Sequence, residues 1–154
     1  MATGDFEGAG LVWDLRSGQN IWALHKDGHV KKLVSLRYSP NSYQIATGSD
    51  DNSVKIWDLR KKACIYTVPA HTKLVSDIKF EDEYDGRLMM TSSYDNKCKL
   101  WTTGASGEWG VLVRTLTGHE NKITSSSITR DLNFIITTSF DRTFKLWQMK
   151  KTPQ

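Results

Sequence analysis

The sequence predicts an all-β fold made of four-stranded antiparallel sheets that repeat along the chain. Three stretches, residues 46–60, 91–101 and 137–147, each read as a short strand, a tight turn and a second strand that contains a tryptophan. Each turn carries an Asp, whose short side chain bonds to nearby backbone and tolerates left-handed neighbours. After the first of these turns Val54 and Ile56 alternate with Lys55, which is the period-2 pattern of a half-buried strand.

Two markers recur in the same phase. Four tryptophans hold the same place in the pattern, at intervals of 44, 44 and 46 residues: Trp13, Trp57, Trp101 and Trp147. Three histidines precede the last three of them by 28, 30 and 28 residues: His29, His71 and His119. A period of about 40–45 residues with Gly-His and Trp-Asp markers is typical of a WD40 propeller blade. Over its whole length the chain therefore resembles the WD-repeat family, and the resemblance implies a WD40-type β-propeller fragment of four consecutive blades.

In chain order we expect blades at about residues 1–25, 26–69, 70–117 and 118–150, of which the first and last are incomplete. The first blade should use strands at 1–5, 10–15 and 21–24, and the second at 33–38, 43–48, 54–59 and 64–68. The third should use 75–80, 88–91, 98–101 and 111–116, and the fourth 123–128, 134–137 and 143–149. Since propellers close with several more blades, we expect residues 1–154 to form the C-terminal part of a longer WD40 β-propeller, with uncovered sheet edges.

Two loops of the third blade are expanded, at residues 81–86 and 104–110. The second holds Trp109, which either anchors a partner or packs against its own blade; packing is the favoured prediction.

Composition narrows the classes of function. The net charge of +4 permits an anionic partner without requiring one. No apolar run reaches the length of a membrane-spanning helix, so no membrane partner is expected. Cys64 and Cys98 are far apart and outside any Cys-x-x-Cys pair, which favours free thiols over a disulfide or a metal site.

A His, a Ser, an Asp and a Trp recur in fixed register in the last three blades. The sets are His29, Ser49, Asp51, Trp57; His71, Ser93, Asp95, Trp101; and His119, Ser139, Asp141, Trp147. Ser, His and Asp together suggest a hydrolase, because an oriented base can activate a hydroxyl. Repetition argues against this reading, since an active site is needed once and a structural lock once per blade. The family resemblance implies a buried hydrogen-bonded chain that ties loop, turn and third strand. We expect no enzyme activity, no cofactor, no metal and no small-molecule substrate.

The first blade departs from this pattern. Glu7 stands where the other blades have Asp, and Asp5 stands where they have Ser.

Residues 3–16, 66–71 and 139–147 carry a closer resemblance, to the WD-repeat proteins of the U4/U6 small nuclear ribonucleoprotein. It implies a non-catalytic protein-interaction scaffold of the U4/U6 and tri-snRNP particles in pre-mRNA splicing, located in the nucleus. The implied partners are splicing proteins of the U4/U6 particle, and the resemblance leaves open whether U4/U6 snRNA is contacted directly. The alternative is a WD40 scaffold of another assembly, such as a ubiquitin-ligase substrate receptor or a signalling adaptor.

Partners of the family often dock on the face that carries the histidine loops and the turns between second and third strands. Residues three and five after each His, and one before each Asp, mark that face. They are Lys32, Val34, Asp50, Leu74, Ser76, Tyr94, Lys122, Thr124 and Phe140. Tyr94 and Phe140 either present aromatic surface to a partner or pack inward against neighbouring blades; we favour the first.

Overall fold

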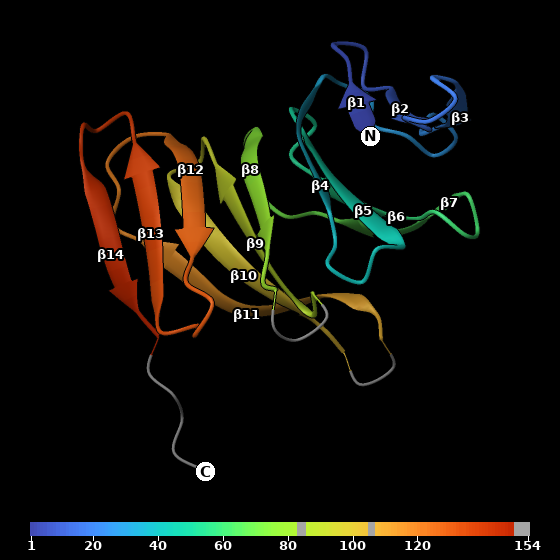
Figure 1. Ribbon diagram of the computed structural model, residues 1–154. Helices are drawn as coiled ribbons and strands as arrows, with labels where there is room; N and C mark the ends of the chain where they lie inside the picture. The colour runs from blue at the N-terminus through green and yellow to red at the C-terminus, as the bar shows by residue number, and fades with distance from the viewer. Residues whose placement is uncertain (83–85, 105–106, 150–154) are drawn as a thin grey trace.

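The computed structural model describes residues 1–82, 86–104 and 107–149, and all regular secondary structure in these ranges is β-strand apart from turns. Figure 1 shows four antiparallel sheets that follow one another side by side in chain order. The predicted all-β class and the repeated antiparallel sheets are confirmed. Parts of the two expanded loops and the residues after 149 lie outside the described ranges.

The first sheet contains β1 (Ala2–Gly4), β2 (Gly10–Trp13) and β3 (Asn20–Ala23). The second contains β4 (Leu33–Tyr38), β5 (Gln44–Ser49), β6 (Val54–Asp58) and β7 (Ala63–Val68). The third contains β8 (Val75–Phe80), β9 (Leu88–Ser93), β10 (Lys97–Thr103) and β11 (Trp109–Thr117). The fourth contains β12 (Ile123–Ile128), β13 (Phe134–Ser139) and β14 (Phe144–Gln148).

The strands pair in chain order within every sheet, and the first strands of successive sheets contact one another. Thus β4 contacts β1 on one side and β8 on the other, and β8 in turn contacts β12. The strand expected at 33–38 has the observed bounds, and those expected at 75–80 and 123–128 do as well. The second strands run further than expected, to Ser49, Ser93 and Ser139, because hydrogen bonds described below hold these serines against the turn.

The turns after β5, β9 and β13 share one backbone conformation. Asn52, Asn96 and Arg142 each follow the repeated Asp and have φ near 70° (70°, 67° and 66°). Asn tolerates this left-handed region because its side chain is short and can bond locally. Arg142 has no such advantage, and the turn holds it there through the bonds that its neighbours make.

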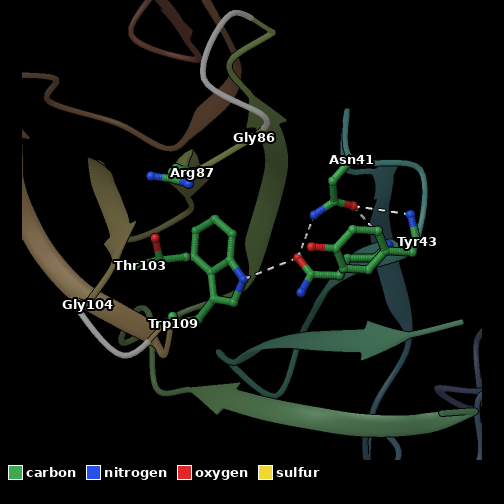
Figure 2. Close-up of a pocket in the computed structure, with 9 residues that line it drawn as sticks. Asn41, Tyr43, Gly86, Arg87, Thr103, Gly104 and Trp109 are labelled. Atoms are coloured by element: carbon green, nitrogen blue, oxygen red, sulfur yellow. Dashed lines mark hydrogen bonds between the residues drawn. The ribbon is translucent and has the colours of Figure 1, made fainter. Parts of the chain in front are cut away.

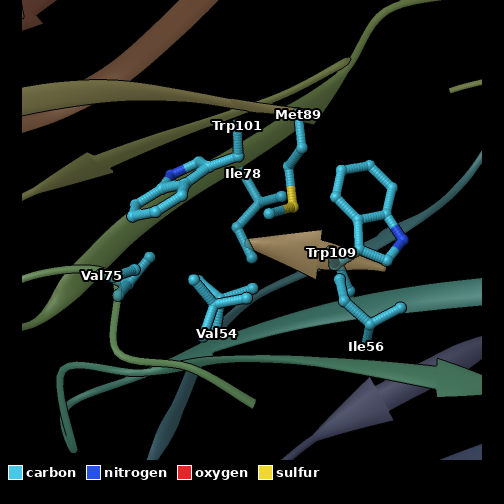
Figure 3. Close-up of a cluster of buried hydrophobic side chains, with 10 residues drawn as sticks. Val54, Ile56, Val75, Ile78, Met89, Trp101 and Trp109 are labelled. Atoms are coloured by element: carbon cyan, nitrogen blue, oxygen red, sulfur yellow. The ribbon is translucent and has the colours of Figure 1, made fainter. Parts of the chain in front are cut away.

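Apolar side chains fill the junctions between sheets. The cluster in Figure 3 joins Val54 and Ile56 of the second sheet to Val75, Ile78 and Met89 of the third. All five are fully buried, and burying a side chain of this size contributes roughly 1.5–3 kcal/mol. Two similar clusters fill the junctions between the first and second sheets and between the third and fourth.

Trp109 is packed rather than exposed, as favoured from the sequence, and only 7% of its surface is accessible. Its ring meets Phe80 of its own sheet edge to face, with centroids 5.7 Å apart. Its indole Nε1 donates to Gln44 Oε1 of the second sheet at 3.5 Å. The side chain therefore also ties two neighbouring sheets together, a role that its sequence position did not predict.

Candidate functional site

A polar network of the same geometry occurs once in each of the last three sheets. The His Nδ1 lies 2.8, 2.9 and 2.7 Å from Oδ2 of the repeated Asp in chain order. The His Nε2 lies 2.8 Å from a threonine Oγ1 in every network, and the indole Nε1 of the Trp donates to the same oxygen at 2.8, 2.9 and 2.9 Å. The carboxylate can only accept, so Nδ1 carries the hydrogen and the threonine hydroxyl can donate to Nε2.

The connecting residues are Thr47, Thr91 and Thr137, which the sequence reading missed. They are fully buried, and each stands ten residues before its Trp and two before its Ser. That constant interval was the signal that could have found them. The first sheet keeps half of the network: Trp13 Nε1 donates to Thr3 Oγ1 at 3.0 Å.

The repeated serines occupy a different place from a catalytic nucleophile. Ser49 Oγ donates to the Lys31 carbonyl at 3.0 Å and accepts the Asp51 backbone N–H at 3.1 Å. Ser93 and Ser139 make the same pair of bonds. Each serine hydroxyl donates its hydrogen to a backbone carbonyl, so the Ser joins the histidine loop to the turn. The structure brings His, Asp and Trp together through the Thr and not through the Ser. The serine, histidine and aspartate are not aligned as a nucleophile and its base.

Hydrogen bonds keep the repeated aspartates ionised. Burial of the Asp95 carboxyl favours its protonated form, but bonds from His71 and from the Thr72 and Lys97 backbone N–H groups outweigh it and lower the pKa to about 2. The pKa of Asp141 is also lowered, chiefly by the Thr143 hydroxyl. Burial lowers the pKa of His29 even though Asp51 opposes the shift, which keeps this imidazole neutral at pH 7.

The turn face is the end of the sheets that carries the β5–β6, β9–β10 and β13–β14 turns and the three histidine loops. On it Tyr94 and Phe140 come from neighbouring sheets and meet edge to face, with ring centroids 6.3 Å apart. Lys122 Nζ lies 4.9 Å from the centre of the Tyr94 ring. Phe140 is 57% exposed and Tyr94 is half-buried, so the two rings pack on each other and leave part of their surface open.

The other residues expected on this face divide into two groups. Lys32 Nζ lies 4.0 Å from Asp50 Oδ2 with both side chains partly exposed, and Leu74 is buried. The residues five after each His are the unpaired residues of a bulge in the inner strand: Val34, Ser76 and Thr124. Ser76 Oγ donates to the Ile123 carbonyl at 2.7 Å, and Thr124 Oγ1 to the Thr138 carbonyl at 3.2 Å. Those two hydroxyls therefore stabilise the sheets.

A groove of about 470 Å³ opens on the turn face. Five residues from the predicted set line it: Lys32, Asp50, Leu74, Tyr94 and Lys122. Four further lining residues lie outside the three positions per repeat that the sequence predicted for this face: Lys31, Asn52, Thr72 and Lys73.

A second cavity, of about 510 Å³, lies at the opposite ends of the strands, between the second and third sheets (Figure 2). Gln44 Oε1 accepts hydrogen bonds from Trp109 Nε1 and, at 3.1 Å, from Asn41 Nδ2. Tyr43 also lines this cavity, and the Arg60 guanidinium stacks 3.8 Å from the centre of its ring. These contacts fix one wall of the cavity.

A buried carboxylate links three inner strands. Asp77 on β8 accepts hydrogen bonds from the Ser125 hydroxyl at 2.7 Å and from the Ser126 N–H at 3.1 Å, both on β12. Arg37 Nη2 on β4 approaches it to 3.6 Å. No pattern in the sequence indicated this bridge.

The residues that the structure describes hold no cluster of three or more His, Cys, Asp or Glu side chains suited to a metal ion. They also hold no helix long and apolar enough to cross a membrane.

The family model for the WD domain, G-beta repeat (WD40) matches residues 18–58, 62–102 and 110–148. Each matched segment combines the last strand of one sheet with the three strands of the next, so the sequence repeat is offset from the sheets. Because of this offset, each repeat spans a junction between two sheets.

Several known proteins are similar in sequence to most of this chain. The LEC14B protein of Lithospermum erythrorhizon is 29% identical over 140 residues, which is 91% of this chain and 29% of the relative. The nuclear distribution protein nudF of Aspergillus flavus is 28% identical over 80% of this chain and 26% of its own length. WD repeat-containing protein 1 of Rattus norvegicus is 27% identical over 92% and 22%. The chain spans less than a third of the length of these relatives.

Proposed function

The chain belongs to the WD40 repeat family, and we propose that it is a non-catalytic scaffold that binds other proteins through its turn face. The observation that carries the proposal is the Tyr94–Phe140 pair, which two neighbouring sheets form at the surface beside Lys122. Aromatic side chains inside a polar rim are the usual energetic centre of a protein interface. The repeated His and Asp side chains support the non-catalytic part of the proposal, because they hydrogen-bond to each other inside each sheet.

We propose further that the assembly is the U4/U6 particle of pre-mRNA splicing and that the protein acts in the nucleus, with splicing proteins as its partners. The support lies in the sequence, in the resemblance that residues 3–16, 66–71 and 139–147 carry.

A scaffold in another assembly is the second candidate. Similarity to a relative named for nuclear distribution, over 80% of this chain, supports it. A ubiquitin-ligase substrate receptor or a signalling adaptor would belong to this class.

Affinity purification of the tagged protein from its source cell tests both levels of the proposal. The splicing assignment expects small nuclear RNAs and their proteins to be recovered, whereas enrichment of cullin-type ligase subunits or of nuclear-distribution proteins would overturn it. Replacement of both aromatic residues, Tyr94→Ala with Phe140→Ala, should lower recovery of the partners by about tenfold or more, since hot-spot truncations cost at least about 2 kcal/mol.

The matched control is Leu15→Ala, because Leu15 is 73% exposed and lies in the turn between β2 and β3, at the other end of the strands from the turn face. It should leave recovery unchanged. Full recovery with the double variant would contradict the turn face as the partner site, and a parallel loss of folding and recovery would show that the two rings act in packing.

A further inference from the structure

The groove on the turn face draws its walls from three sheets. Lys31, Lys32 and Asp50 come from the second sheet or the loop before it, and Lys73 precedes the third. Lys122 enters from the loop before the fourth sheet. A segment lying in this groove would contact three successive repeats at once.

The charge in the groove is strongly one-sided. Among the residues that the structure describes, four lysines line it against a single carboxylate, that of Asp50. Within the described ranges Lys31, Lys73 and Lys122 form no ion pair with a carboxylate. Lys32 Nζ pairs with Asp50 Oδ2 at 4.0 Å. Positive groups gathered in a cleft focus their field and attract an anionic partner, most strongly at low ionic strength.

The groove also has an apolar part. Leu74, which is 8% exposed, and Tyr94 both line it, and the Phe140 ring packs edge to face against the Tyr94 ring. The site therefore offers cationic groups for charge and an apolar contact within the same short distance.

We infer that the groove binds a protein segment rich in Asp and Glu that carries one apolar side chain beside its acidic residues. The inference rests on the proposed scaffold function and names the chemistry of its partner. Lysine ammonium groups pair with the carboxylates, the apolar side chain packs on Leu74 and Tyr94, and Asp50 accepts a backbone N–H of the bound segment.

Three features favour carboxylates on a peptide over phosphate groups or nucleic acid. Among the described residues the groove is lined by lysines and by no arginine, whose planar fork is the better match to phosphate. Asp50 repels a phosphodiester backbone, which has no N–H to offer in exchange, whereas a peptide does. The Lys122 ammonium already lies over the Tyr94 ring, which leaves less room there for a flat base to stack than for one small apolar side chain that also packs on Leu74.

Fluorescence anisotropy with the complete chain tests the inference directly. The probe is a labelled glutamate-rich peptide with one central leucine, and the comparison probe has glutamine in place of every glutamate. We expect the acidic probe to bind and to weaken as salt is raised, and the glutamine probe to bind at least about tenfold more weakly.

The variant Lys31→Glu with Lys73→Glu should weaken the acidic probe by about tenfold, since two exposed pairs are lost and replaced by repulsion. The matched control is Lys61→Glu with Lys62→Glu, which makes the same charge change in the turn between β6 and β7. It should leave binding within about twofold, since that turn lies at the other end of the strands.

Equal binding of both probes, or unchanged binding by the Lys31 and Lys73 variant, would overturn the inference. So would tighter binding of a phosphoserine peptide or of a single-stranded RNA of equal charge. These outcomes concern purified chain and probe alone. Recovery of cellular partners that still depends on Tyr94 and Phe140 would leave the scaffold function standing, so the two failures are distinguishable.

Discussion

Equivalent positions in the third and fourth sheets have opposite surroundings. Leu100 on β10 and Leu146 on β14 each stand directly before the repeated Trp. Leu100 is fully buried among Ile123, Ile135 and other residues of the junction with the fourth sheet, whereas Leu146 is 58% exposed. Cys98 and Phe144, two residues earlier, differ in the same way, at 0% and 74% exposed.

The repeat therefore fixes which face of each sheet is apolar, while burial depends on the next sheet. In repeat architectures each unit contacts only its neighbours, so stability is close to a sum of terms within units and terms between them. The apolar junctions contribute to the stability that neighbouring sheets gain from each other. The His–Asp–Thr–Trp networks lie within single sheets and contribute to the stability of each sheet by itself.

The largest expected effect compares the two leucines directly. Leu100→Ala should lower the free energy of unfolding by about 2–5 kcal/mol, because it leaves a cavity in a closed junction. Leu146→Ala should cost less than about 1 kcal/mol, since its side chain is already mostly in contact with water. Urea denaturation of both variants measures the difference. Equal losses would mean that the fourth sheet is covered in solution.

The second effect should be the same in both sheets. Asp95→Ala and Asp141→Ala each remove the partner of a buried histidine, and for Asp95 the loss should be about 1.5–3 kcal/mol. Because the networks close within their own sheets, the two losses should agree, unlike those of the leucines. Asp50→Ala is the control: its carboxylate is partly exposed and 4.0 Å from Lys32, so the change should be nearly neutral. Thermal unfolding checks all three, and a large loss with Asp50→Ala would contradict the assigned register.

How much could be predicted from the sequence follows the same division. Strand positions and the His, Asp and Trp of each network repeat along the chain, and a repeat is visible without a structure. The threonines repeat too, but Thr is an ordinary strand residue and nothing in its type marks it as a bridge.

Contacts between sheets were out of reach for a different reason. The Asp77 bridge to Ser125, and the bond from Trp109 to Gln44, join residues 48 and 65 positions apart that share no periodic signal. The groove combines lysines that lie in one place only after three sheets are assembled. Pattern reading assigns residues to faces, and the packing of one sheet on another decides which faces meet.

Acid should weaken the His–Asp–Thr–Trp networks within the sheets. The pKa of Asp95 is about 2 in the folded chain and 3.8 in the unfolded chain, so the folded state favours the ionised carboxyl. This stabilisation is complete above pH 3.8 and is lost as the pH falls through about 2. Urea midpoints should therefore decline from about pH 4 to pH 2, and Asp95→Asn should flatten part of that decline. An unchanged slope in this variant would contradict the assignment.

The smallest expected change in stability comes from Leu146→Lys, which should leave the free energy of unfolding within about 0.5 kcal/mol because the position is exposed. Its effect should appear in association instead. Phe144, Leu146 and Ile136 form an exposed apolar face, and in sedimentation experiments at rising concentration we expect the unchanged chain to associate through it. The charge should suppress that association. Val113→Lys is the matched control, since Val113 is equally exposed but lies on β11, the edge of the third sheet. Suppression by the control alone would show that strand edges, and not the uncovered face, hold the copies together.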